Sequence, residues 1–388
     1  MEEMPSLVYP AGEGRALREV VDGAEAIARG AIAAGCTFFA GYPISPATSI
    51  LLHMIQELPK VGGIAIQAED EISAMGFCIG AALAGAKVMT ATSGPGISLY
   101  SEHIGLAIMG EVPMVIVDCQ RLGPATGGAT TVAQGDVQFV RWGTSGGYPI
   151  IALCPTSVTD CFSLTMEAFN LAERFRVPVF LLTDKEVVAT SEVVEDAAFQ
   201  LIPVVPRRYA PPHIPFTPYH VKDLADVPLM AAVGGPHIVR FTSSTHDERG
   251  YLTKDPEKVD RLNRHLAAKI EALADDIGWV DADLEPGATA LIVSYGVTAR
   301  SAREAVKLAR GEGIKVSLAI VKTLWPVPVR ALRMAFQGIQ RVVVAELNLG
   351  LYRREIERLA GGCDIVGVHR VDGELLSPQE ILEVGGIM

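Results

Sequence analysis

The sequence predicts an α/β protein in which two parallel sheets, each covered by helices, are separated by an irregular connector. Three observations support this prediction. Short apolar runs alternate with helix-like segments over residues 21–195 and again over 286–388. The intervening segment, 196–285, is rich in proline and polar residues. The chain of 388 residues is also too long for one average domain.

The first unit follows an N-terminal extension, 1–20, and its expected strands are apolar on both faces, as helices on both sides of a sheet require. These strands are 36–43, 62–67, 87–93, 113–119, 148–155 and 178–184. The expected helices lie between them, at 23–35, 46–57, from about 69 through GFCIGAALAGA, and at 97–109 and 157–174.

The connector begins with the proline-rich stretch VPRRYAPPHIPFTPYH, which cannot be regular, and continues through the polar loop THDERGYLTKDP. A charged helix follows over 259–277, with apolar residues on one face. The second unit has expected strands at 290–296, 314–321, 341–347 and 364–368. Its expected helices are 298–313, one after Pro326 and one from Leu351, which together make one compact domain.

Composition excludes several classes of function. The net charge of −12 argues against nucleic acid or an anionic membrane surface as the main partner. There is no apolar stretch long enough for a membrane span and no signal-peptide pattern, so we expect a cytoplasmic protein. The six cysteines form no CxxC pair, which indicates buried reduced thiols and no metal site in this chain.

The turn GYPISPATS, 41–49, follows the first of the expected parallel strands. Ser45 is expected to cap the next helix, with Pro46 at its first position, where a missing N–H costs nothing. A helix start at the carboxyl end of a parallel strand is also a common anion site. The turn therefore predicts either a helix start alone or one whose Ser45 hydroxyl also holds a carboxylate.

Two further segments are candidates for ligand contact. In TSGPG, 92–96, Gly94 and Gly96 permit close backbone approach, although the motif is neither GxGxxG nor a P-loop and a plain tight turn is equally open. A long polar loop, 120–136, carries Arg121 at the end of the preceding strand, and this arginine can make a bidentate contact to a carboxylate. Arg141 is a second candidate, and either arginine can instead pair with an acid of the protein.

Three acids stand together at the expected start of the helix in QAEDEISAMGFCIG. All three suit a helix N-terminus, but helical spacing separates them. Glu71 shares a face with Met75, Cys78 and Ala82, whereas Glu69 shares one with small residues. Glu71 is therefore expected to be buried. Because buried acids without partners are rare, a ligand or a partner chain must supply its partner.

At these residues the sequence resembles the alpha subunit of 2-oxoacid:ferredoxin oxidoreductases, most closely the 2-oxoglutarate type. The resemblance covers nearly the whole chain. It rests on GYPISPATS, on QAEDEISAMGFCIGAALAGAKVMTATSGPG, and on GDVQFVRWGTSGG, HDERG and AELNLG. It implies a thiamine-diphosphate-enzyme pyrimidine-binding domain followed by a transketolase C-terminal-like α/β domain.

The resemblance also implies the cofactors and the partners. Thiamine diphosphate would be shared with a beta subunit that supplies the magnesium–diphosphate site and a [4Fe-4S] cluster, with coenzyme A as co-substrate. This division explains why the chain has no GDG…N segment and no clustered cysteines. A hetero-oligomer of (alpha-beta)2 type or larger follows, with gamma and delta subunits as further candidates and ferredoxin as electron acceptor.

Site roles are carried over by the same resemblance. Glu71 would meet the aminopyrimidine ring nitrogen, and Tyr42, Pro43, Ser93 and Gly94 would also bind the cofactor. Ser45 and Arg121 would hold the substrate carboxylate, and Arg141 or Thr144 would face the distal end of the substrate. Relatives of the 2-oxoglutarate type often read GTHGD where this chain reads GTSGG at 143–147, which leaves the exact acid open.

The expected reaction is therefore the oxidative decarboxylation of 2-oxoglutarate with coenzyme A, with electrons passed to ferredoxin through iron–sulfur clusters of partner subunits. A branched-chain or aryl 2-oxoacid is the alternative within this class. A transketolase-like transferase half-enzyme and a non-catalytic scaffold subunit are alternatives outside it. The presence of Glu71, Ser45 and Arg121 argues against the scaffold.

Overall fold

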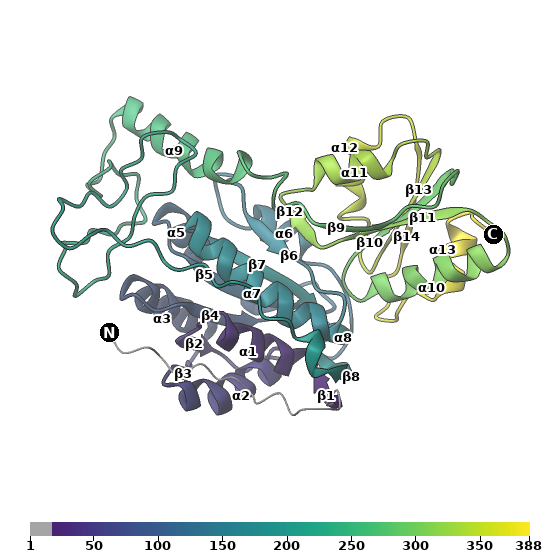
Figure 1. The fold of residues 1–388 in the computed structure, drawn as a ribbon, viewed down its shortest axis with the longest axis horizontal. Helices are drawn as coiled ribbons and strands as arrows, with labels where there is room; N and C mark the ends of the chain where they lie inside the picture. Colours follow the sequence, from purple (N-terminus) through teal and green to yellow (C-terminus); the bar gives the residue numbers. More distant parts are fainter. Residues whose placement is uncertain (1–17) are drawn as a thin grey trace.

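A computed structural model describes residues 18–388, so that most of the expected extension, 1–20, lies outside the described residues. Two sheets lie beside each other, the larger built mainly from the first half of the chain (Figure 1). The larger sheet has seven strands in the order β12-β6-β7-β5-β4-β2-β3. Their bounds are β2 Phe38–Gly41, β3 Ile64–Gln67, β4 Val88–Thr92, β5 Met114–Gln120, β6 Ile151–Leu153, β7 Pro178–Asp184 and β12 Thr323–Trp325.

Neighbouring strands of the larger sheet are parallel except for β12, which comes from the second half of the chain and pairs antiparallel with β6. Helices cover both faces. One face carries α1 Gly23–Ala33, α2 Thr48–Glu57, α7 Val158–Phe175 and α8 Lys185–Ala189. The other carries α3 Glu71–Leu83, α4 Pro95–Leu99, α5 Ser101–Met109 and α6 Val137–Trp142.

Alternation along the central strand β5 shows which side chains meet which helices. Val115 and Val117 pack in the cluster with α1, α2 and α7, whereas Met114 and Ile116 pack with α3 and α5. Since successive side chains of a strand point to opposite faces, the next even position, Asp118, faces the α3–α5 side. An acid thus continues an otherwise apolar row on that side.

The predicted strands of the first unit are all present, but several helix bounds were wrong. The single helix expected over 97–109 is two helices, α4 and α5, and the first starts at Pro95. The helix expected to start near residue 69 starts at Glu71, because Asp70 caps it by accepting a hydrogen bond from the Ser73 N–H at 2.6 Å.

Several short elements were not predicted, because each is too brief to show a periodic pattern. They are α6, α8, β12, the antiparallel ribbon of β1 Arg18–Asp22 with β8 Ser191–Glu195, and α13 Pro378–Val384, together with the 3₁₀ turns η1 Leu58–Val61 and η2 Asp196–Ala198.

The connector has no helix or strand between residues 199 and 255, and α9, Pro256–Glu271, follows. Leu262, Leu266 and Ile270 of α9 are buried, as the amphipathic pattern predicts. Arg207 fastens the irregular part to the first unit by pairing with Glu173 at 2.7 Å and by donating to the carbonyls of Ala82 and Ala86. No helix of residues 18–388 is long and apolar enough to cross a membrane.

The smaller sheet has five strands in the order β14-β13-β10-β11-β9. Their bounds are β9 Val280–Asp283, β10 Ala290–Ser294, β11 Val316–Val321, β13 Arg341–Glu346 and β14 Asp364–His369. The helices are α10 Thr298–Gly311, α11 Val329–Ala335, α12 Arg353–Leu359 and α13. Strand β9 falls inside the segment expected to be connector, yet it pairs antiparallel with β11 at the edge of this sheet.

Candidate active site at the carboxyl edge of the larger sheet

The parallel strands β2, β3, β4 and β5 end at the same edge of the larger sheet. The chain leaves these ends through the segments that hold Ser45, Glu71, Gly94 and Arg121, so residues far apart in sequence come together. In open α/β sheets this edge is the usual position of a ligand. The contacts described below show which of the expected residues meet there.

The three consecutive acids before α3 have three different environments. Glu69 is exposed, Asp70 is the cap of α3, and Glu71 is only 7% exposed. The Ser73 hydroxyl and N–H both donate to Asp70 Oδ1, which lowers the pKa of that carboxyl. The expectation that Glu71 lies on the buried face of the helix is confirmed.

Glu71 packs against the start of α4 without a hydrogen bond to any group of residues 18–388. A Cβ added at Gly96 would lie 3.0 Å from Glu71 Oε1 and 2.0 Å from Thr92 Oγ1, so only glycine permits this approach. The Thr92 and Ser93 hydroxyls are buried and likewise have no partner in the described chain. Unpartnered buried polar atoms are rare in native proteins, and here two adjacent residues, Thr92 and Ser93, carry them close to Glu71.

Arg121 is 4% exposed and lies across the adjacent turn. Its Nη1 donates to the Ser45 carbonyl at 2.6 Å, and its Nη2 donates to the Thr126 carbonyl at 3.0 Å. A Cβ at Gly94, where φ is +53°, would lie 2.7 Å from Arg121 Nε, and that Nε has no hydrogen-bond partner among the described groups. The structure therefore brings Ser45, Gly94 and Arg121 together.

The expectation that Ser45 caps the next helix was wrong. Helix α2 begins at Thr48, and residues 45–47 form a turn. A hydrogen bond from the Thr48 N–H to the Ile44 carbonyl, at 2.9 Å, closes this turn. The backbone closes this turn itself, so no hydroxyl is needed as a cap. The exposed Ser45 instead offers its carbonyl to Arg121.

Two acids near Arg121 were not among the expected site residues. Asp118 on β5 is fully buried, with neither carboxylate oxygen hydrogen-bonded within the described chain, and burial together with nearby Asp136 raises its pKa well above the usual value. Burial raises the pKa of Asp136 to about 7, although Arg121 opposes the rise. The available signal was a lone acid inside the apolar strand PMVIVDC.

Neither Arg121 nor Arg141 forms an ion pair within 4 Å with an acid of the described chain. The alternative that these arginines pair with an acid of the protein is therefore not observed in residues 18–388. Arg141 donates to the Gly147 and Tyr148 carbonyls and stacks 3.9 Å from the Trp142 ring. Burial lowers its pKa.

The other expected residues are placed as follows. The hydroxyl of half-buried Thr144 packs against Gly105 of α5. Tyr42 and Pro43 are half-buried in the segment after β2. The contacts of Arg141 and Thr144 are therefore separate from the cluster around Glu71 and Arg121.

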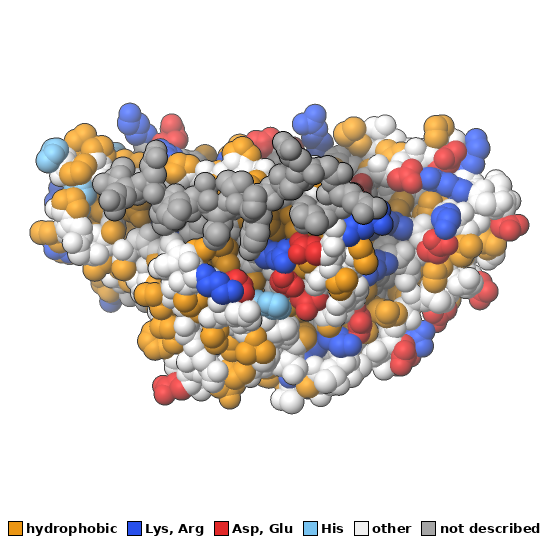
Figure 2. Space-filling model, turned by 60° about the horizontal axis from the view of Figure 1, so that its bottom comes forward, with side chains coloured by type: hydrophobic (Ala, Val, Ile, Leu, Met, Phe, Trp, Pro, Cys, Tyr) orange, Lys and Arg blue, Asp and Glu red, His pale blue; other side chains and the backbone are white. Residues whose placement is uncertain are grey.

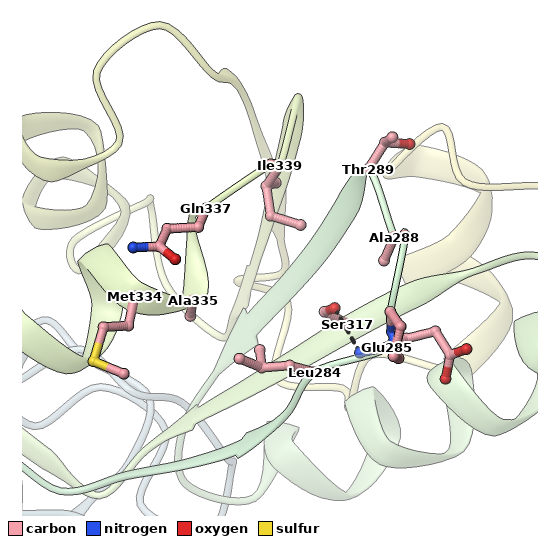
Figure 3. A pocket seen from close by; sticks show the side chains of 12 residues that line it. Leu284, Glu285, Ala288, Thr289, Ser317, Met334, Ala335, Gln337 and Ile339 are labelled. Atoms are coloured by element: carbon pink, nitrogen blue, oxygen red, sulfur yellow. Dashed lines mark hydrogen bonds between the residues drawn. The ribbon is translucent and has the colours of Figure 1, made fainter.

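Two further observations concern other possible ligand and metal sites. A hollow of about 470 Å³ lies on the second unit, lined by residues such as Leu284, Ser317, Met334 and Gln337, and contains none of the expected site residues (Figure 3). No group of three potential metal-ligating side chains gathers within residues 18–388, where all six cysteines are free and only Cys363 is not fully buried.

Comparison with known proteins gives consistent matches. Residues 29–264 match the family described as pyruvate flavodoxin/ferredoxin oxidoreductase, thiamine diphosphate-binding. Residues 288–381 match core domain II of pyruvate:ferredoxin oxidoreductase. The 2-oxoglutarate synthase subunit KorA of Methanothermobacter thermautotrophicus is 42% identical over 371 residues, which cover 94% of this chain and 97% of that protein. The ketoisovalerate oxidoreductase subunit VorB of the same organism is 35% identical over 367 residues, covering 94% and 96%.

A solved structure is also similar over most of the chain. It is a 2-oxoglutarate:ferredoxin oxidoreductase from Magnetococcus marinus with 2-oxoglutarate, coenzyme A and succinyl-CoA bound. The TM-score is 0.89 at 32% identity, and the match covers 94% of this chain but 64% of that one.

Proposed function

Because the chain belongs to the 2-oxoacid:ferredoxin oxidoreductase family as an alpha subunit, we propose that its complex oxidatively decarboxylates 2-oxoglutarate with coenzyme A and passes the electrons to ferredoxin. The observation that carries this proposal is the environment of Glu71. A nearly buried carboxyl without a partner in the described chain lies beside unpartnered hydroxyls and a glycine that permits close approach.

These residues fit the pyrimidine half of thiamine diphosphate. Glu71 would accept or share a proton at a ring nitrogen, and Thr92, Ser93 and the backbone at Gly94 would line the ring. When bound, the cofactor supplies the carbanion chemistry of 2-oxoacid decarboxylation. Gly96 leaves room for the Glu71 side chain beside the start of α4.

We assign recognition of the 2-oxoacid carboxylate to Arg121. A cation that is 4% exposed and has no ion-pair partner in the described chain is costly to bury, and a carboxylate ligand would offset that cost. The Ser45 and Thr126 carbonyls hold two of its donors and leave the others free to form charge-assisted hydrogen bonds. The Ser45 hydroxyl is exposed on the same turn and can add a further contact.

A beta subunit is proposed to supply the diphosphate–magnesium site and the iron–sulfur cluster. Apolar side chains are exposed on α2, on β3 and on α3, the helix that carries Glu71 (Figure 2). They include Leu52, Ile64, Ile72 and Phe77. Exposed apolar patches mark protein–protein contacts. Such a contact would place the partner's half of the cofactor site beside Glu71.

The name of the VorB relative keeps a branched-chain 2-oxoacid as the second candidate substrate. The test is reduction of ferredoxin or a viologen by the purified complex over a panel of straight, branched and aryl 2-oxoacids with coenzyme A. The highest kcat/KM is expected with 2-oxoglutarate. A preference for a branched acid would replace the substrate, and turnover without electron transfer would favour the transferase alternative.

A further inference from the structure

The loop after Arg121 is closed by its own hydrogen bonds. The Leu122 N–H donates to the Thr131 carbonyl at 2.9 Å, and the Gly128 N–H donates to the Leu122 carbonyl at 2.8 Å. At the far end, the Asp136 N–H donates to Gln120 Oε1 at 3.1 Å, beside the strand end from which the loop left. The loop also carries the Thr126 carbonyl that accepts a hydrogen bond from Arg121. The position of the guanidinium therefore depends on the conformation of the loop.

Gln134, near the end of this loop, is fully buried between the two units. Its side-chain amide donates to the Tyr295 carbonyl at 3.1 Å and to Asp184 Oδ2 at 3.3 Å. Its Oε1 accepts from the Thr298 hydroxyl and the Leu347 N–H, both at 3.1 Å. Most of these partners belong to the second unit, so the loop is attached to that unit.

The backbone of Gln134 adds two more bonds to the same unit. Its N–H donates to the Leu347 carbonyl at 2.9 Å, and its carbonyl accepts from Asn348 Nδ2 at 2.7 Å. The second unit is shaped for this approach. Gly296 has a φ of +56°, and a Cβ there would lie 2.3 Å from Gln134 Nε2 and 2.6 Å from Asp184 Oδ2.

A second contact joins the same loop to the second unit. Gly373, with a φ of +87°, lies against Thr131, and a Cβ at Gly373 would lie 2.0 Å from the Thr131 methyl group. Thr131 supplies the carbonyl that closes the loop on Leu122. The second unit thus contacts the loop at two separate points, and both are close to hydrogen bonds that define its shape.

We propose that Gln134 is a positioning residue through which the second unit fixes the 120–136 loop and thereby orients the guanidinium of Arg121 toward the 2-oxoacid carboxylate. Gln134 itself makes no contact with substrate in this assignment. The proposal rests on the carboxylate role of Arg121 given above. It predicts that loosening the loop weakens substrate binding more than it slows turnover.

The test compares Gln134→Met, which keeps the volume but removes the amide, with Arg300→Ala in the full complex. Arg300 also joins the two units, by donating to the Thr156 carbonyl at 3.1 Å and pairing with Glu192, but it does not contact the loop. Gln134→Met should raise the KM for the 2-oxoacid about tenfold or more, with kcat changed by less than about threefold. Arg300→Ala should leave the KM unchanged.

Hydrogen exchange of the free chain gives a readout that needs no substrate. The amides of Leu122 and Gly128 should exchange faster in Gln134→Met and at the wild-type rate in Arg300→Ala. Unchanged exchange and KM in Gln134→Met, or an equal KM rise in Arg300→Ala, would overturn the proposal. If the wild-type complex oxidises no 2-oxoacid, the proposed function fails, and the exchange rates still decide whether Gln134 holds the loop.

A second variant decides the matter if Gln134→Met does not fold. Gly373→Ala pushes on Thr131 from the second unit and leaves Gln134 intact, so it should also raise the KM. Adding Thr131→Ser removes the methyl group that the new Cβ would meet, so the double variant should have a KM closer to the wild-type value. A Gly373→Ala enzyme with wild-type KM and wild-type loop exchange contradicts the proposal.

Discussion

At the residue scale, burial separates side chains that are chemically alike. Glu69, Asp70 and Glu71 are consecutive acids, yet one is solvated, one caps a helix and one is enclosed beside unpartnered hydroxyls. The start of α3 decides this division, because it sets which acid precedes the helix and which lies on its buried face. The following predictions concern single residues of this site.

Glu71→Gln should lower kcat of the complex by roughly 10²–10⁴-fold at saturating thiamine diphosphate, because an amide cannot share the proton that a carboxyl can. The measurement is steady-state 2-oxoacid oxidation. Glu69→Gln is the matched control and should keep wild-type turnover, since that side chain is exposed. Near-normal kcat in Glu71→Gln would falsify the assignment.

Arg121→Ala should raise the KM for the 2-oxoacid by about 10–100-fold, which corresponds to the loss of charge-assisted hydrogen bonds of about 1.5–3 kcal/mol. Thiamine diphosphate affinity should stay at the wild-type value, because the cofactor contacts are assigned to other residues. Arg174→Ala, an exposed arginine of α7, serves as the control. An unchanged KM in Arg121→Ala excludes the carboxylate role.

Asp118 and Asp136 should make the stability of the chain depend on pH. The pKa values of Asp118 and Asp136 are raised in the folded state, so the folded chain holds protons that the unfolded chain releases. Stability should therefore fall as the pH rises from about 4 to about 7, by at most about 1.4 kcal/mol per pH unit for each proton.

Asp118→Asn removes one of these two groups, so the stability of the variant should decrease less as the pH rises. The measurement is urea unfolding of the full chain at a series of pH values between 4 and 8. The same dependence on pH in the wild-type protein and the variant would show that Asp118 does not hold a proton in the folded state.

At the element scale, the turns after the parallel strands decide which groups meet. The strands and long helices were predictable, because their apolar patterns extend over many residues. The turns were less so. The split between α4 and α5 and the late start of α2 follow from backbone hydrogen bonds that no residue pattern predicts.

Gly96→Ala tests the close approach between α3 and α4. The added methyl group meets Thr92 Oγ1 and Glu71, so we expect a loss of about 1–3 kcal/mol in the free energy of unfolding. Thiamine diphosphate affinity of the complex should fall as well, because the Glu71 carboxyl is displaced. The measurements are urea unfolding of the chain and titration of the complex with the cofactor.

Gly80→Ala on α3 is the control for this variant, since nothing lies within 4 Å of its added Cβ. It should stabilise the chain by roughly 0.5–1 kcal/mol, as alanine does inside a helix. Equal effects of the two substitutions would show that the space left by Gly96 is not needed for the contact between α3 and α4.

At the scale of the whole molecule, a buried charge cluster fastens the connector to the first unit. Lys269 of α9 donates to Glu111 Oε2 at 2.8 Å and to the Arg176 carbonyl at 3.2 Å. Arg176 in turn donates to the carbonyls of Pro218, Pro228 and Leu229 in the connector. Burial alone would raise the pKa of Glu111, but Lys269, His265 and Arg176 lower it well below its usual range.

Lys269→Met should reduce the free energy of unfolding at pH 7 by about 3–5 kcal/mol, because it leaves the Glu111 carboxylate buried without its main partner. Urea unfolding measures the loss. Arg264→Ala on the same helix breaks an exposed pair with Asp260 and should cause no measurable change. Similar results for the two variants would mean that the cluster does not hold the connector.

The sequence by itself determined the alternation of strands and helices, the amphipathic face of α9 and the burial of Glu71, because each depends on a local repeat of apolar residues. Only the tertiary structure decided which turns meet. It brought the Ser45 carbonyl and Gly94 to Arg121, joined Gln134 to the second unit and enclosed Asp118 beside Asp136. These contacts join residues far apart in the chain, and their geometry follows from strand order, which a single sequence does not state.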